Sequence, residues 1–419
     1  MADSRPLVDD AGLFGWWRAA DVRARRAFVA ASAGWMLDSF DVMLYSLVLA
    51  SLIQDPTLQL STSVAGQLGA ITLLAAAAGG VVFGVLADRW GRKRALMAAV
   101  LIYSVFTAAC GLAQSVAQLA IFRVLLGFGM GGEWATGVAL VSETFPARHR
   151  GKALAFVQSS WAIGYGLAAV VNLIVAPGWG WRGVFFVGVL PALFTLWIRR
   201  KVEEPEMWRR TQDTARGRIS DLFTPDRARV TVFIVVMNAC CLFGWWGLNL
   251  WVPAYLNLPT DRGGIGLSSS AMSWFVIAMQ VGMWLGYVSF GYIADAIGRK
   301  RTYVVFVLMA SLLLPLYGNL RQPLLLLLLG PFVAFFGTGY FSGFGAVIAE
   351  LYPTSIRATA AGVGYNVGRI ASAAAPFVVG SMAGTRGFGV AFAITGAAFF
   401  LAALAWVGIP DTQNRELAA

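Results

Sequence analysis

The chain has 419 residues, of which 58% are hydrophobic and only 13% are charged, and its formal net charge is +11. Soluble domains have roughly 25% charged residues, so this composition excludes a soluble globular protein and indicates a polytopic membrane protein. The basic residues gather in alternate loops, so the positive charge reflects membrane topology, and we expect no nucleic-acid partner.

Twelve apolar stretches are long enough to cross a hydrocarbon core of about 30 Å as helices. They cover residues 27–53, 63–87, 95–113, 118–142, 152–176, 182–199, 229–257, 269–294, 302–320, 323–349, 358–383 and 387–408. We therefore predict an all-α membrane protein with twelve transmembrane helices. They form two pseudo-symmetric six-helix bundles, at 1–199 and 229–419, joined by a cytoplasmic linker at 200–228.

The distribution of basic residues also predicts the orientation of the chain. Most Lys and Arg residues lie at the N-terminus, in the loops from even to odd stretches or at the C-terminus. Because cytoplasmic loops carry this excess, both termini are expected in the cytoplasm. The excess of Arg over Lys is typical of a GC-rich bacterial genome, which favours the bacterial inner (plasma) membrane.

The sequence lacks the signatures of an enzyme or of a cofactor-binding protein. It contains no GxxxxGK[ST] phosphate-binding loop, and its single histidine, His149, has no second His or Cys nearby. Cys110, Cys240 and Cys241 all lie in predicted spans and indicate no disulfide framework. We expect no catalytic site, no metal and no bound cofactor.

Spans one and four carry ionisable residues, which are costly within a membrane and usually functional. Counting 1.5 Å per residue from the cytoplasmic edge places Asp38 and Glu133 near the midplane, Asp41 further out and Arg123 close to the outer edge. Without a histidine in a span, the proton carrier has to be one of the three acids, with Arg123 offsetting one aspartate. We predict proton-coupling roles for all four. The alternatives are a polar helix-packing cluster for the aspartates and, for Glu133, a contact that pins span four to span one.

A charged loop occurs twice, at an offset of 207 residues. Residues 84–94 reappear as 291–301, and a second pair of landmarks keeps the same offset. The glycines allow close helix approach, while the aspartates cap the next helix or pair with Arg across the cytoplasmic mouth. The alternative is a set of basic signals that only fix orientation. The residues predicted to form this gate are Gly84, Asp88, Arg92, Glu143, Arg150, Gly291, Asp295, Arg299, Glu350 and Arg357.

Several polar residues of other spans recur at helical spacing and could line a cavity between the bundles. Packing or an interfacial belt is the alternative for each aromatic residue taken singly. The residues predicted to line the cavity are Gln158 and Tyr165 in span five, Asn249 in span seven, Gln280 in span eight and Tyr340 in span ten. Trp161, Asn172, Trp245, Phe341 and Phe344 are expected beside them.

Span eleven carries Arg369, which also comes out near the midplane. Arginine cannot discharge itself by losing a proton, so it is a natural anion clamp. Tyr365 and Asn366 precede it by four and three positions and share its helix face. We predict that a carboxylate docks bidentately on this guanidinium, with Tyr365 and Asn366 as neutral donors. The alternative is a structural ion pair with a carboxylate of the other half.

The repeated GxxxDxxGRKR loop, the twelve spans and the central link resemble the major facilitator superfamily over the whole chain. Residues 38–41 resemble the paired-aspartate motif of aromatic-acid proton symporters and of sialate and lactate symporters. Residues 123–132 resemble a motif associated with proton transfer, and residues 179–188 and 203–208 resemble the sialate/lactate branch. The Gly-Pro pair typical of drug-proton antiporters is missing from residues 156–174. The resemblance implies a proton-coupled organic-anion symporter.

The charges and the resemblance together predict a secondary active transporter that works by alternating access. It would import a small organic anion with H⁺ as the coupling ion: a monocarboxylate such as lactate or pyruvate, a sialate or an aromatic acid. We expect a monomer in the lipid bilayer. The alternatives are a proton-coupled drug or cation antiporter, which leaves Arg369 structural, and a membrane sensor that binds a metabolite without moving it.

Overall fold

The computed structural model describes residues 17–411 apart from 19, 146, 204–218 and 353. Every regular element in this part of the chain is a helix, which confirms the all-α prediction. The first half contains α2 (Val22–Gln54), α3 (Thr62–Trp90), α4 (Arg92–Cys110), α5 (Val116–Thr144), α6 (Ala147–Val187) and α7 (Pro191–Lys201). The second half contains η1 (Ile219–Leu222), α9 (Pro225–Asn257), η2 (Thr260–Arg262), α10 (Ser269–Ile297), α11 (Arg299–Asn319), α12 (Pro323–Thr338), α13 (Phe341–Leu351), α14 (Thr354–Ser372), α15 (Ala374–Arg386), α16 (Phe388–Ala405) and η3 (Trp406–Gly408).

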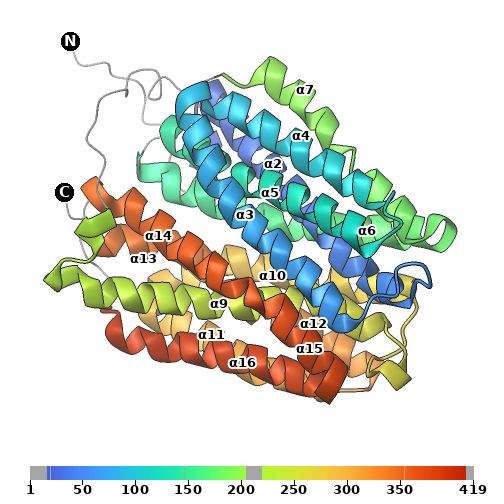
Figure 1. Ribbon diagram of the computed structural model, residues 1–419. Helices are drawn as coiled ribbons and strands as arrows, with labels where there is room; N and C mark the ends of the chain where they lie inside the picture. Colours follow the sequence, from blue (N-terminus) through green and yellow to red (C-terminus); the bar gives the residue numbers. More distant parts are fainter. Residues whose placement is uncertain (1–16, 19, 146, 204–218, 353, 412–419) are drawn as a thin grey trace, which may run out of the picture.

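The helices run roughly lengthwise through the molecule in two groups. Figure 1 shows the blue-to-green helices of the first half above the yellow-to-red helices of the second, with the first and the last described residues at the same end of the bundle. We call this the termini end and the opposite one the far end. A chain that leaves the bundle at the end where it entered has crossed it an even number of times, as the twelve predicted spans require.

Within the described residues, 11 helical stretches are long and apolar enough to cross a membrane. The difference from the predicted twelve arises in α6, where one continuous stretch, Lys152–Ile198, takes in both the fifth and the sixth predicted span. Gly180, with φ 60° and ψ −168°, interrupts the helical backbone between them. The chain therefore turns at Gly180, and two successive helical stretches lie on either side of it.

The repeated loops fold in the same way in both halves. Gly91 lies between α3 and α4 with φ 106°, and Gly298 lies between α10 and α11 with φ 98°. Residues with a side chain rarely adopt such positive φ values, so glycine is required at both turns. The second glycine of each repeated loop thus has a clear backbone role.

The first glycine of each repeated loop does not have the predicted role. A Cβ atom added to Gly84 or Gly291 would meet no described atom within 4 Å, so neither mediates a close helix approach. Close approach occurs deeper in α5, where a Cβ on Gly131 would lie 1.9 Å from the carbonyl oxygen of Ala76, and one on Gly127 2.3 Å from that of Thr72. Small residues thus bring α3 and α5 into backbone contact, as in other membrane bundles.

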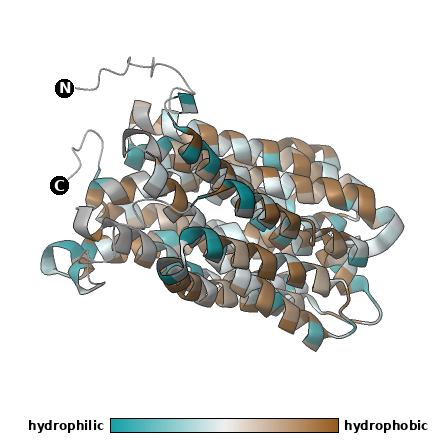
Figure 2. Ribbon diagram, turned by 90° about the horizontal axis from the view of Figure 1, so that it is seen from above, coloured by the Kyte–Doolittle hydropathy of each residue, from teal (hydrophilic) through white to brown (hydrophobic). Residues whose placement is uncertain are grey.

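Large apolar side chains cover the outside of the molecule. Val81, Leu112, Ile174 and Leu312 are all at least 63% exposed, and Figure 2 shows hydrophobic residues along the lengths of the helices. In water such a surface would promote aggregation, whereas in a bilayer it faces lipid. Buried polar side chains lie inside the molecule, within each half and where the two halves meet.

Candidate functional site

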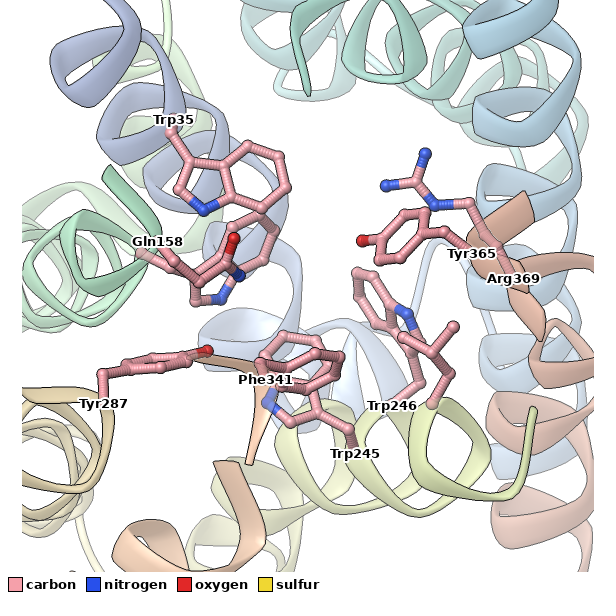
Figure 3. Close-up of a pocket in the computed structure, with 10 residues that line it drawn as sticks. Trp35, Gln158, Trp245, Trp246, Tyr287, Phe341, Tyr365 and Arg369 are labelled. Atoms are coloured by element: carbon pink, nitrogen blue, oxygen red, sulfur yellow. The ribbon is translucent and has the colours of Figure 1, made fainter. Parts of the chain in front are cut away.

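A cavity lies between the two halves and receives side chains from six helices. About 290 Å³ of empty space, part of which is open to solvent, lies among its lining side chains. Its lining is strongly aromatic (Figure 3). The lining residues are Trp35 of α2, Gln158 and Trp161 of α6, Leu242, Trp245 and Trp246 of α9, Tyr287 of α10, Phe341 of α13, and Tyr365 and Arg369 of α14.

Arg369 is the only charged side chain in this lining. It lies in the last turn of α14, is 2% exposed, and its guanidinium carbon lies 5.2 Å from the centre of the Tyr365 ring one turn earlier. Its Nε atom has no hydrogen-bond partner among the described residues. A buried cation with an unused donor is suited to a negatively charged ligand, because leaving such a group unpaired is costly.

The acids that face this cation belong to the first half. Asp38 of α2 and Glu133 of α5 are each 1% exposed, and both interact electrostatically with Arg369. No ion pair within the described part joins Arg369 directly to Asp38. All three groups, predicted to lie within the membrane-spanning helices, are buried.

Asp41 lies one turn beyond Asp38 on α2 and is also 1% exposed. It interacts electrostatically with Asp38 and lies beside the hydroxyl groups of Ser104 and Thr107 of α4. The two aspartates therefore form one coupled acidic group, with Asp38 nearer to Arg369 and Asp41 directed into the first half.

The expected partnership of Arg123 with an aspartate is not formed. Its guanidinium carbon lies 4.0 Å from the centre of the Tyr45 ring, and its Nε donates to Thr72 Oγ1 at 3.1 Å. The physical reason is that α3 and α5 touch through their glycines, which places Thr72 beside Arg123 and leaves Asp41 facing α4. Arg123, 1% exposed, is held by a cation–π contact and a neutral hydroxyl.

Glu133 also fits the alternative reading, in which it pins α5 to α2. A Cβ atom on Gly34 would lie 2.4 Å from Glu133 Oε1, so the carboxyl group rests against the α2 backbone. This contact places Glu133 on the same side of α2 as Asp38. Its proton-coupling role stays a prediction.

Of the eight residues predicted to bind substrate, Arg369, Tyr365 and Gln158 line the cavity. Tyr340 does not, because its hydroxyl donates to the Cys241 carbonyl at 3.0 Å and its ring packs on Tyr303 and Phe341 inside the second half. Asn366 faces α3 near Gly80. Tyr165, Asn249 and Gln280 lie outside the lining as well.

Tyr165 and Asn249 instead help to close the far end of the interface. Pro253 lies within α9 and has no N–H group, so the carbonyl of Asn249, four residues earlier, has no partner in its own helix. Two donors of the first half supply the missing bond: Tyr165 Oη at 2.9 Å and Ser46 Oγ at 2.8 Å. Ser46 also donates to the Leu250 carbonyl at 2.9 Å.

Further hydrogen bonds between described residues of the two halves lie toward this far end. Asn172 of α6 donates to Ser269 and Ser273 of α10 at 3.0 and 2.9 Å. Ser381 of α15 donates to Ser63 of α3 at 3.3 Å. The two halves are therefore fastened beyond the cavity on the side away from the termini.

The predicted gate lies at the termini end and is only partly described. Arg299 Nε and Glu350 Oε1 form a partly buried salt bridge at 3.4 Å, and Lys300 Nζ donates to the carbonyl of Ile409 at 2.9 Å. Arg92 lies in the corresponding first-half turn. The side chains of Asp88, Asp295, Glu143, Arg150 and Arg357 lie outside the described part, and their gating roles stay predictions.

The sequence analysis missed Trp35, Trp246 and Tyr287 as lining residues. Trp35 precedes Asp38 by three positions, which places both on one face of α2. Trp246 follows Trp245 directly, and a tryptophan pair in a span is an unusual signal. Tyr287 carried no comparable signal, because its position depends on the rotation of α10 against α6.

The fold and the cavity define a membrane carrier of two helical bundles around a central, positively charged site. The family model of the Major Facilitator Superfamily matches residues 31–260 and 256–419, and the chain belongs to this superfamily. The xylose transporter of Escherichia coli has a similar fold, with a TM-score of 0.76 at 22% identity over 95% of this chain and 100% of that one.

Several relatives are transporters of organic acids or related metabolites. A putative metabolite transport protein of Haemophilus influenzae is 35% identical over 98% of this chain and 100% of its own length. A probable 4-methylmuconolactone transporter of Cupriavidus pinatubonensis is 35% identical over 88% of this chain and 86% of its own length. A cis,cis-muconate transport protein of Acinetobacter baylyi is 32% identical over 90% and 91%. The chain thus lies in the organic-anion branch of the superfamily.

Proposed function

We propose that this protein imports a small, planar organic acid, aromatic or otherwise unsaturated, together with protons. The observation that carries the proposal is a single buried guanidinium, Arg369, in a cavity walled by four indole rings. The guanidinium binds a carboxylate as a planar fork, and the indole faces cover a flat apolar body. The name of the 4-methylmuconolactone transporter supports such a substrate.

The cavity favours an aromatic acid over the other predicted substrates. A sialate is a polyhydroxylated sugar acid, and apolar indole faces would leave most of its hydroxyl groups without hydrogen-bond partners. Lactate and pyruvate have short chains that would leave most of the indole surface without a contact. A flat ring matches the aromatic walls and leaves its carboxylate free to bind Arg369.

Proton coupling is supported by the buried acids of the first half. Moving an anion into a cell with a negative interior costs roughly 2.3 kcal/mol per charge per 100 mV, so accumulation needs a driving ion. When the carboxylate substrate occupies Arg369, Asp38 and Glu133 lose the field of their nearest cation, which favours their protonated forms. Protonation and anion capture therefore stabilise the same state, and the halves rock around it.

A cation or drug antiporter is the less favoured alternative. A cationic substrate in this cavity would lie against Arg369, which cannot release its charge. The positive charge of the loops at the termini end supports cytoplasmic termini in a bacterial inner membrane. Nothing in the proposed cycle needs more than one copy of the chain.

Uptake into proteoliposomes tests the proposal. Radiolabelled benzoate, lactate and a sialate are offered at an acidic outside pH, with and without a protonophore. We expect accumulation of benzoate that the protonophore abolishes, and Arg369→Gln without accumulation. The variant Trp197→Phe, in α7 and outside the cavity, serves as the control. Benzoate uptake that does not depend on the pH gradient would exclude proton coupling. Uptake of lipophilic cations and of none of the acids would favour the antiporter.

A further inference from the structure

The cavity has a second polar side that the anion clamp does not use. Gln158 and Tyr287 lie across the space from Arg369 and Tyr365, and the hydroxyl groups of both tyrosines are directed into it (Figure 3). Gln158 comes from α6 of the first half and Tyr287 from α10 of the second, and their side chains interact with each other. This side contains no charged group among the described lining residues.

Three indole donors surround the same space without partners. The Nε1 atoms of Trp35, Trp161 and Trp245 are buried and make no hydrogen bond to any described residue, and each of these side chains is 3% exposed. An indole N–H can only donate, and a buried donor without a partner is unfavourable. A ligand that supplied an acceptor would therefore be held here.

The rings are fixed by packing on one another, which makes these donors a built feature. The Trp35 and Trp161 ring centroids are 4.6 Å apart, and those of Trp161 and Trp245 are 5.5 Å apart. The second contact joins the two halves across the cavity. The donors are thus held in place before a ligand arrives, and little rotamer freedom is lost on binding.

A second carboxylate would be poorly accommodated on this side. Arg369 is the only cation of the lining, and the nearby acids Asp38 and Glu133 add negative charge. A buried anion that meets only neutral donors and neighbouring acids is strongly disfavoured. An uncharged acceptor meets the same donors without this penalty.

We propose that Trp35, Trp161, Trp245, Gln158 and Tyr287 form a neutral acceptor-binding pole. It selects planar carboxylates that carry a second, uncharged acceptor such as a carbonyl, lactone, hydroxyl or ring nitrogen. This inference rests on the proposed function, because it takes the first carboxylate to be bound at Arg369.

Binding of four matched acids to the purified protein tests the pole. Benzoate has no second group, 4-acetylbenzoate and its 3-isomer carry a neutral carbonyl, and terephthalate carries a second carboxylate. We expect the better acetylbenzoate isomer to bind about three- to tenfold more tightly than benzoate, the gain of one good hydrogen bond. Terephthalate is expected to bind at least about tenfold more weakly than that isomer.

Variants that remove a donor and keep a ring locate the effect. Trp245→Phe, Trp161→Phe and Tyr287→Phe should each reduce the preference for the acetyl acid, measured as the ratio of its affinity to that of benzoate in the same variant, by about three- to tenfold. Trp197→Phe, whose indole stacks on Phe194 at 5.2 Å in α7, is the matched control and should not change this ratio. If one of the three variants does not fold, the other two are sufficient for the test.

The outcomes separate this inference from the proposed function. Equal binding of benzoate and both acetyl isomers, or an equal loss for all acids in the three variants, overturns the pole and leaves the carboxylate site intact. Tight binding of terephthalate overturns it as well. If no acid binds and none is transported, the proposed function itself fails.

Discussion

The two halves of the molecule share a repeated sequence but carry opposite buried charges. The first half holds three buried acids, Asp38, Asp41 and Glu133, against one buried cation, Arg123, whereas among the described buried residues of the second half the only charged one is Arg369. At the offset that aligns the loops, Glu133 corresponds to Tyr340 and Arg369 to Ala162. The repeat therefore supplies a common scaffold, and the function depends on the positions where the halves have diverged.

This division of charge gives each half one task. The acids of the first half can exchange protons, while the guanidinium of the second half keeps its charge and holds the anion. The two tasks meet across the cavity, where Asp38 and Glu133 interact with Arg369 without the need for direct pairing. A ligand or a proton that changes one side therefore changes the stability of the other.

The largest expected effect comes from replacing the guanidinium group of Arg369 in the second half. Arg369→Lys keeps the charge but loses the planar, two-point contact with a carboxylate. We expect benzoate uptake to fall by about 100-fold, since hydrogen bonds to charged groups contribute about 1.5–3 kcal/mol each. Initial uptake rates in proteoliposomes measure this. Uptake at the wild-type rate would show that Arg369 is structural, and would contradict the proposal that the second half binds the anion while the first half exchanges protons.

Neutralising the acids of the first half should give a different defect. Asp38→Asn and Asp41→Asn remove the proton site but leave Arg369 in place. We expect concentrative uptake driven by a pH gradient to fall by about tenfold or more, whereas exchange of labelled for unlabelled benzoate stays within about twofold of wild type. Proton-driven accumulation retained in both single variants would exclude the aspartates as carriers.

Much of this contrast could be predicted from the sequence. Hydropathy and the repeat predicted the helices, and the rarity of charges in spans identified Asp38, Glu133 and Arg369 as buried groups before any coordinates. The surroundings of each charge could not be predicted in the same way. Arg123 was expected beside an aspartate, but its partners Tyr45 and Thr72 depend on how closely the glycines of α5 approach α3.

The same limit applies to the neutral part of the cavity. Tyr340 and Tyr365 look alike in a sequence, and only the rotation of their helices sends one hydroxyl to the Cys241 carbonyl and the other into the cavity. Helical periodicity predicts which residues share a face, but it does not say which neighbour that face meets. Trp35 and Tyr287 therefore became apparent as cavity residues only in three dimensions.

A moderate effect is expected where the halves join at the far end. In the double variant Ser46→Ala/Tyr165→Phe, the Asn249 carbonyl loses both of its donors. A buried carbonyl without a partner costs about 1–3 kcal/mol, so thermal unfolding in detergent should occur at a lower temperature. Pro253→Ala restores an N–H group to α9 and with it the bond within the helix.

The proline makes this prediction specific. In the Pro253→Ala background the Ser46→Ala/Tyr165→Phe change should lower the unfolding temperature less than in wild type. An equal loss in both backgrounds would show that the two donors act through packing, and that the free carbonyl of the second half is not what the first half recognises.

The smallest expected effect tests how far the two halves remain alike. Gly91 and Gly298 hold φ values of 106° and 98° at the same turn of the repeated loop. An added Cβ strains such a backbone by about 1 kcal/mol or more, so Gly91→Ala and Gly298→Ala should lower the unfolding temperature to similar extents.

Gly84→Ala and Gly291→Ala are the matched controls, since an added Cβ meets no described atom within 4 Å at either site. Because alanine favours a helix interior over glycine by about 0.5–1 kcal/mol, these two variants should be as stable as wild type or slightly more. A marked loss in Gly84→Ala alone would show that the first loop packs differently from the second, and that the divergence of the halves extends from the buried charges to the scaffold itself.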